Sequence, residues 1–110
     1  MSEQCPWDIS VEDLKALRDA GSEYVLLDVR EPHEHEICHL EEGQLVPLQT
    51  LEGRLGELPR DGHIVVLCRS GMRSAAAVNA MREIGFTNTW NVQGGILAWI
   101  HQIDPSLTPY

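Results

Sequence analysis

Two short apolar runs constrain the fold of this chain more than any other feature. They cover residues 24–29, which read YVLLDV, and residues 63–68, which read HIVVLC. Neither run alternates with polar residues, a pattern typical of strands that are buried on both faces of a sheet. Segments with helical spacing lie before, between and after them. The sequence therefore predicts an α/β fold, with a parallel sheet covered by helices on both faces.

The remaining elements are predicted from local signals. Ser10 and Asp13 can form a capping box at the start of a helix that Gly21 ends, and Gly85 ends a longer helix over 73–84. We further expect short helices over 31–37 and 51–58, strands over 44–48 and 87–93, and a closing helix over 96–103 after a turn at 94–95.

Length and composition narrow the class of protein. The 110 residues predict one complete domain over residues 1–110. A formal net charge of -9 disfavours binding to nucleic acid or to anionic membranes. The three cysteines, Cys5, Cys38 and Cys68, are odd in number and widely spaced, which argues against a disulfide framework. Because the first ten residues also lack the pattern of a secretory signal, we expect a cytoplasmic protein.

Cys68 ends the second apolar run and opens the stretch CRSGMRS. The carboxyl ends of parallel strands are where ligands bind in such sheets. The amide groups of residues 69–73, the positive end of the next helix, and the charges of Arg69 and Arg73 would all favour the thiolate. Since the thiolate is the reactive form of cysteine, this loop is the candidate active site.

Ser70, Gly71 and Met72 separate the two arginines of the loop. Ser70 and Gly71 would let the chain turn tightly, because glycine tolerates backbone angles that other residues avoid. Met72 would line the mouth of the pocket. Such a loop could hold a thiolate or an oxyanion such as a sulfonate. The alternative interpretation is a buried structural cysteine beside solvated arginines.

Three motifs lie in order along the chain: LLDVREPHEHE, the CRSGMRS loop and NVQGGILAWI. With them, the chain resembles the single-domain rhodaneses, a family of sulfurtransferases, from about residue 7 to residue 110. The resemblance implies a rhodanese-like, five-stranded parallel sheet. It also implies that Cys68 is catalytic and carries a sulfane sulfur as a persulfide, and that residues 69–73 bind the sulfur donor. Thiosulfate or a persulfide would be the donor, and no metal or organic cofactor would be required.

The ending GGILAWIHQIDPSLTPY is further similar to the rhodanese domain at the carboxyl end of molybdopterin-synthase sulfurylases. This likeness implies a small sulfur-carrier protein as an acceptor of sulfur, beside thiols and cyanide.

Two alternatives share the fold implied by the resemblance. The first is a non-catalytic rhodanese-like module that binds a partner or senses redox state, which the intact Cys68, Arg69 and Arg73 disfavour. The second is a phosphatase or arsenate reductase, whose loop is one residue longer than the six residues from Cys68 to Arg73.

The run HEICH, residues 35–39, matches the zinc-binding pattern H-E-x-x-H. That pattern needs a helix of several turns, which so short a run just after Pro32 does not provide. We therefore predict no metal site. A solvated turn is favoured over incidental metal capture by His33, His35, Cys38 and His39.

Structural roles are favoured for four other residues, and for two of them, Asp28 and Arg30, the alternative is that they border the active-site pocket. Asp28 and Arg30 lie at the carboxyl end of the first apolar run, where Arg30 would pair with a carboxylate. Trp90 and Trp99 lie in apolar contexts and are expected in the core. Cys5 lies in a polar segment and is expected to be exposed, with a role as a resolving or relay thiol as the weaker alternative.

Overall fold

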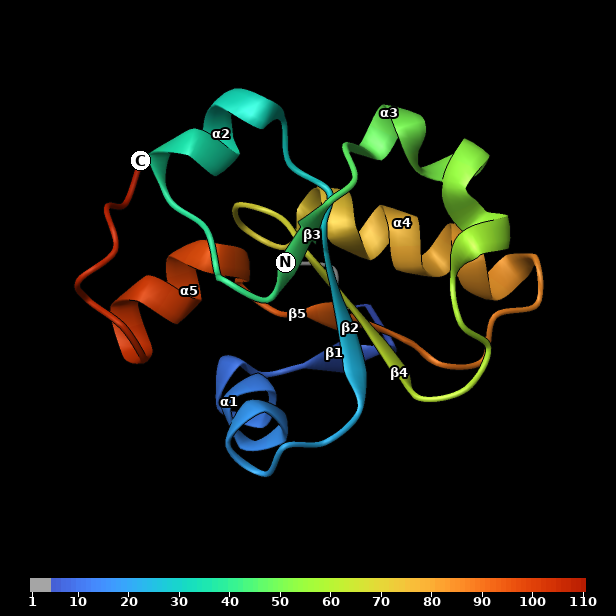
Figure 1. Ribbon diagram of the computed structural model, residues 1–110, viewed down its shortest axis with the longest axis horizontal. Helices are drawn as coiled ribbons and strands as arrows, with labels where there is room; N and C mark the ends of the chain where they lie inside the picture. The colour runs from blue at the N-terminus through green and yellow to red at the C-terminus, as the bar shows by residue number, and fades with distance from the viewer. Residues whose placement is uncertain (1–4) are drawn as a thin grey trace.

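The computed structural model describes residues 5–110, which form a five-stranded sheet covered by helices (Figure 1). The strands are β1 (Asp8–Ile9), β2 (Tyr24–Asp28), β3 (Gly43–Leu45), β4 (His63–Leu67) and β5 (Thr89–Val92). The helices are α1 (Val11–Asp19), α2 (Pro32–Ile37), α3 (Leu48–Leu51), the 3-10 helix η1 (Glu52–Glu57), α4 (Met72–Glu83) and α5 (Gly95–Gln102). The strand order is β1-β5-β4-β2-β3, and every neighbouring pair is parallel, which confirms the predicted α/β class.

The central strands β2 and β4 are buried on both faces of the sheet. Leu27 and Val66 belong to the core under α3 and α4, whereas Leu26 and Val65 belong to the core under α1 and α5. Figure 1 shows the strands between these two groups of helices. The two continuous apolar runs in the sequence are therefore confirmed as two-faced strands.

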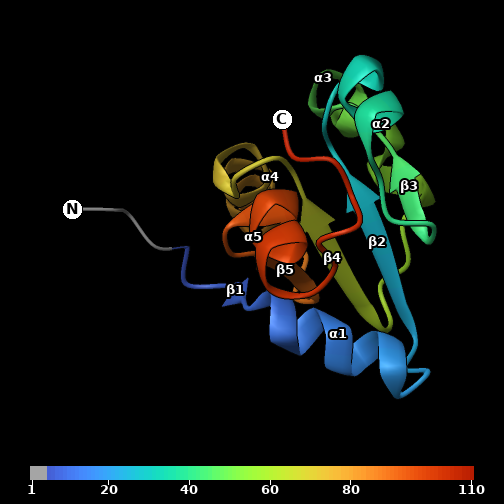
Figure 2. The same ribbon diagram turned by 90° about the vertical axis from the view of Figure 1, so that its left-hand side faces the viewer.

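The carboxyl ends of β2 and β4 lie side by side at the middle of the sheet. The chain leaves β2 towards β3 on one side and leaves β4 towards β5 on the other. Neighbouring strands whose connections diverge in this way bind ligands at their carboxyl ends. Asp28 ends β2, and Cys68 follows β4 directly. Figure 2 shows α2, the start of α4 and the carboxyl-terminal end of the chain at this same end of the sheet.

Most local predictions agree with the structure, and β1 is the main exception. The capping box at the start of α1 is present, with Ser10 and Asp13 exchanging hydrogen bonds at 3.0 and 3.1 Å. No strand was predicted at Asp8–Ile9, which pairs with Asn91 and Val92 of β5. Two residues are too few to show any periodicity, so only the pairing defines this strand.

The region between β3 and β4 differs from the prediction in its boundaries. The strand predicted over 44–48 is shorter and begins earlier, at Gly43, and the chain already turns into α3 at Leu48. The helix predicted over 51–58 divides into α3 and the 3-10 helix η1, which contains Gly53 and Gly56. Glycine has a low α-helix propensity, and a turn of the tighter 3-10 helix is common at the end of an α-helix.

The expectation that both tryptophans lie in the core is confirmed for Trp99 alone. Trp99 is fully buried, whereas Trp90 is half-buried beside Trp7 and donates a hydrogen bond to His63 at 3.1 Å. Trp90 therefore packs against surface aromatic rings. Within residues 5–110, no helix is both long enough and apolar enough to span a membrane.

Candidate functional site

Hydrogen bonds to α5 fix the loop that follows β4. The amide of Ile96 donates to the carbonyl oxygen of Cys68 at 2.9 Å, and the amide of Leu97 donates to that of Arg69 at 3.1 Å. Because these carbonyls face α5, the loop can turn amide groups towards its own interior. Gly71 precedes α4 at φ +99°, a conformation that glycine adopts without strain.

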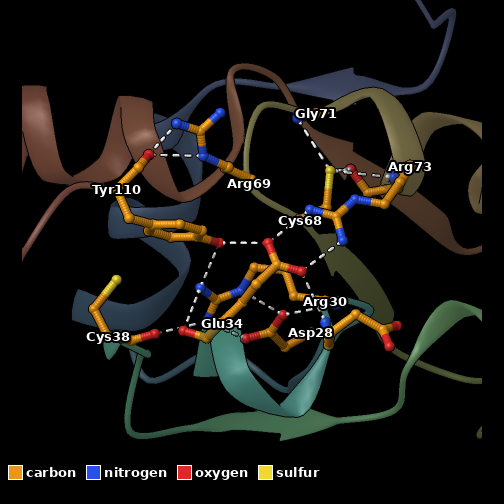
Figure 3. Close-up of polar contacts among 11 residues, drawn as sticks. Asp28, Arg30, Glu34, Cys38, Cys68, Arg69, Gly71, Arg73 and Tyr110 are labelled. Atoms are coloured by element: carbon orange, nitrogen blue, oxygen red, sulfur yellow. Dashed lines mark hydrogen bonds and ion pairs between the residues drawn. The ribbon is translucent and has the colours of Figure 1, made fainter. Parts of the chain in front are cut away.

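The sulfur of Cys68 lies inside this loop with three hydrogen-bond donors around it. The amide of Gly71 lies 3.1 Å from Sγ, the amide of Ser74 lies 3.4 Å away, and the Ser74 hydroxyl lies 3.2 Å away. Figure 3 shows the Gly71 contact above the sulfur. Only 1 % of Cys68 is exposed. Donors directed at one sulfur stabilise negative charge on it.

The donors differ in part from the predicted set of amides at 69–73. Gly71 is the only member of that set that bonds the sulfur, and Ser74 supplies the other two contacts. Ser74 ends the CRSGMRS stretch and lies in the first turn of α4. The sequence offers one signal for this role of Ser74: it lies three residues after Gly71 at the start of a predicted helix, where backbone amides have no partner within the helix.

Arg73 lies near Cys68 but is paired with a carboxylate. Its guanidinium donates to both carboxylate oxygens of Glu34, at 2.7 and 2.8 Å, in the bidentate arrangement that Figure 3 shows. Glu34 is buried in α2. The hydrogen bonds from Arg73 lower the pKa of the Glu34 carboxyl to about 2, and the same contact raises the pKa of Arg73. Glu34 was not among the predicted site residues.

Arg69 is directed away from the sulfur, towards Tyr110. Its Nε atom donates to the main-chain oxygen of Tyr110 at 2.7 Å, and a second guanidinium nitrogen contacts the same oxygen. The guanidinium carbon lies 5.1 Å from the centre of the Tyr110 ring. The Tyr110 hydroxyl also bonds Glu34 at 2.8 Å. The structure therefore brings Arg73, but not Arg69, towards Cys68.

Asp28 and Arg30 form a buried ion pair below these groups. The Arg30 guanidinium donates to both carboxylate oxygens of Asp28 at 2.8 and 2.7 Å, and none of Arg30 is exposed. It also donates to the Tyr110 hydroxyl at 2.9 Å and to the main-chain oxygen of Cys38 at 2.8 Å. The prediction that Arg30 pairs with a carboxylate is confirmed. Breaking such a pair leaves an uncompensated buried charge, so the pair contributes to the stability of the fold.

Ser70 and Met72 face a cavity of about 510 Å³ that also reaches Cys5. Met72 is 79 % exposed and lines this cavity, whereas Cys68 is not among the lining residues. The expectation that Cys5 is exposed is wrong, because its thiol is buried and lies 3.4 Å from the amide oxygen of Asn79. Burial raises the pKa of the Cys5 thiol, which disfavours the thiolate, the nucleophilic form of cysteine.

The HEICH segment forms the end of α2 and the turn after it. His35 and His39 stack with ring centres 4.0 Å apart. Burial is the main cause that lowers the pKa of His35, and the neighbouring His39 ring lowers it further. Cys38 is buried and belongs to the core under α1 and α5. Among residues 5–110, no three His, Cys, Asp or Glu side chains are grouped to hold a metal ion.

A parallel α/β sheet with a buried cysteine in an amide-lined loop at its middle defines the class of protein. The chain belongs to the rhodanese-like domain family, whose model matches residues 10–102. It is 38% identical over 105 residues to the probable adenylyltransferase/sulfurtransferase MoeZ of Mycobacterium tuberculosis, covering 93% of this chain and 26% of that protein.

A plant protein and a solved structure show the same likeness. The adenylyltransferase and sulfurtransferase MOCS3-1 of Zea mays is 36% identical over 93% of this chain and 23% of that protein. The crystal structure of a rhodanese-related protein from Thermoplasma volcanium matches with a TM-score of 0.78 and 35% identity, over 87% of this chain and 92% of that one. The chain thus spans about a quarter of the length of these two curated relatives.

Replacing Gly95 by alanine tests whether α5 holds the loop. Gly95 has φ +63°, and a Cβ atom there would lie 2.6 Å from the carbonyl oxygen of Cys68. We expect Gly95→Ala to lower the free energy of unfolding by at least about 2 kcal/mol, measured by urea denaturation. The control is Gly53→Ala, where a Cβ atom meets nothing within 4 Å. Equal stabilities of the two variants would contradict this role.

Replacing Glu34 by glutamine tests the ion pair with Arg73 through its pH dependence. Because the pKa of Glu34 is lowered from 4.5 to about 2, the pair stabilises the fold above pH 4.5 and loses this effect as the pH falls to 2. We expect Glu34→Gln to cost on the order of 1–3 kcal/mol at pH 7, and the difference to shrink across that acid range.

The matched control for this measurement is Glu57→Gln, which removes an exposed ion pair with Arg54. Exposed pairs contribute little, so its effect should stay within about 0.5 kcal/mol at every pH. A stability difference for Glu34→Gln that persists unchanged down to pH 2 would show that the carboxylate charge is not what matters.

Proposed function

We propose that this protein is a sulfurtransferase that carries a sulfane sulfur as a persulfide on Cys68. The observation that supports this most strongly is the set of three donors around one buried sulfur. A structural cysteine needs no such donors. A sulfur that alternates between thiolate and persulfide does need them, because it repeatedly gains and loses negative charge.

In the first step, the Cys68 thiolate attacks the outer sulfur of a donor such as thiosulfate. A new bond forms between the two sulfurs, and the bond from the outer sulfur to the sulfonate group breaks. Sulfite leaves with the electron pair of that bond, and the negative charge of the persulfide lies on its outer sulfur. The loop amides and the charge of Arg73 favour anions at this position.

In the second step, a nucleophile takes the outer sulfur. A thiolate or cyanide forms a bond to that sulfur, and the electron pair of the sulfur–sulfur bond returns to Cys68. The relatives named above combine adenylyltransferase and sulfurtransferase in one name. This favours a small sulfur-carrier protein as the natural acceptor, and a reducing, cytoplasmic setting fits three free thiols.

The loop residues other than Cys68 are proposed to bind the donor. Gly71 acts through its amide, Ser70 and Met72 through their place at the cavity, and Arg73 through its charge. Arg69 can join them only if its guanidinium leaves Tyr110. The Arg69 guanidinium would then release the main-chain oxygen of Tyr110 and bind an oxygen of the donor in its place.

Two features favour sulfur transfer over phosphate chemistry. A thiolate that attacks phosphorus must accommodate three equatorial oxygens, whereas the sulfane sulfur has only two partners during the transfer, the attacking and the leaving atom, and so fits a site with 1 % of Cys68 exposed. Ester hydrolysis also needs an acid for the leaving oxygen. Glu34 is the carboxyl group paired with the loop, and its pKa of about 2 keeps it ionised at neutral pH.

Mass spectrometry of the intact protein tests the persulfide. After incubation with thiosulfate, we expect a gain of one sulfur, about 32 mass units, that cyanide removes. Cys68→Ser should show no gain, while Cys5→Ser and Cys38→Ser should load sulfur like the parent. Equal sulfur loading of Cys68→Ser would refute the assignment.

Lengthening the loop tests why the donor is a sulfur compound. One glycine inserted between Gly71 and Met72 should widen the loop, displace the amides from Sγ and reduce thiosulfate:cyanide transfer by at least about tenfold. The same assay with an aryl phosphate measures any gain of hydrolysis, with Cys68→Ser as control. Undiminished sulfur transfer in the insertion variant would show that loop size does not select the donor.

A further inference from the structure

The hydroxyl group of Ser74 lies between two acceptors. It is 3.2 Å from the sulfur of Cys68, and it also donates a hydrogen bond to the side-chain oxygen of Asn91. All three residues are buried, with exposed fractions of 0 %, 1 % and 3 % for Ser74, Cys68 and Asn91. A hydroxyl has a single proton, so it can donate to only one of these acceptors at a time.

Asp8 determines which side of the Asn91 amide faces Ser74. The Asn91 nitrogen donates to the carboxylate of Asp8 at 2.7 Å. An ionised carboxylate only accepts hydrogen bonds, so it retains the amide nitrogen and leaves the amide oxygen for Ser74. Asp8 and Asn91 are neighbours because β1 pairs with β5 in register.

We propose that Ser74 is a two-position donor, which bonds Cys68 when the sulfur is a thiolate and Asn91 when it is not. Asp8 is the positioning residue that keeps the second position available. This inference rests on the proposed persulfide cycle. Asp8 of β1 would then influence the reactivity of Cys68 through hydrogen bonds that pass from Asp8 to Asn91, to Ser74 and to Cys68.

The two positions match the two charge states of the cycle. In the persulfide, the negative charge lies on the outer sulfur, so Sγ is a weak acceptor and Ser74 turns to Asn91. When an acceptor removes the outer sulfur, the electron pair returns to Sγ, and Ser74 turns back to stabilise it. The backbone amides of Gly71 and Ser74 cannot move in this way, because the loop and α4 hold them.

A double-mutant cycle on Asp8 and Ser74 tests the proposal. The discharge rate is measured by mixing the sulfur-loaded protein with cyanide and following thiocyanate in a single turnover. The rate of alkylation by iodoacetamide at pH 7 is measured on the tryptic peptide of residues 61–69, which contains Cys68 as its single cysteine. Thermal melting of each variant confirms that it is folded.

We expect Ser74→Ala to slow both rates by about tenfold, because one donor to the thiolate is lost. Asp8→Asn frees the Asn91 amide to turn its nitrogen towards Ser74, so the hydroxyl serves Cys68 alone and both rates rise about two- to fivefold. In the Ser74→Ala background, Asp8→Asn should have no more effect than Glu12→Gln, which removes an exposed charge from the first turn of α1.

The outcomes separate this proposal from the proposed function. Equal effects of Asp8→Asn with and without the Ser74 hydroxyl would overturn the two-position donor, even if sulfur transfer is normal. If Cys68 takes up no sulfur, the persulfide cycle fails, while the alkylation rates still report whether Asp8 acts through Ser74. Non-additive effects in both measurements support the proposal.

Discussion

Two hydrogen bonds from the first turn of α5 to the carbonyl oxygens of Cys68 and Arg69 hold the site together. These bonds orient the carbonyl oxygens of the loop towards α5 and away from the sulfur, so that the amides of Gly71 and Ser74 can face the sulfur. The close approach requires glycine at position 95, because any Cβ atom there would overlap these carbonyls. A sulfur anion on Cys68 would thus be stabilised mainly by backbone groups whose direction is set by packing between the loop and α5.

The charged groups around the loop form a frame that holds elements distant in sequence. Glu34 of α2 binds both Arg73 and the Tyr110 hydroxyl, and the same hydroxyl binds Arg30. The carboxyl-terminal end of the chain is therefore tied to the carboxyl ends of β2 and β4. This explains how a chain with a net charge of -9 keeps cations beside its candidate nucleophile: each of them is matched by a nearby acceptor.

Local features of the sequence predicted the central strands, α1, α4 and the place of Cys68, because a two-faced strand, a capping box and a loop leave short-range patterns. Long-range contacts left none. The pairing of Arg69 with Tyr110 joins residues 41 positions apart. The bond between Asp8 and Asn91 joins residues 83 apart, and it exists only because β1, which is too short to show a period, pairs with β5. The polar neighbours of Cys5 in the sequence indicate exposure, while its place in the core under α3 and α4 decides its burial.

The central claim is that the loop places a sulfur anion on Cys68 within reach of its amides. A crystal structure of the protein after treatment with thiosulfate tests this most directly. The account predicts one additional sulfur atom bonded to Cys68, lying inside the loop and within hydrogen-bond distance of loop amide groups. An additional sulfur on Cys5 or Cys38, or an unmodified Cys68 in protein that has gained sulfur, would contradict it.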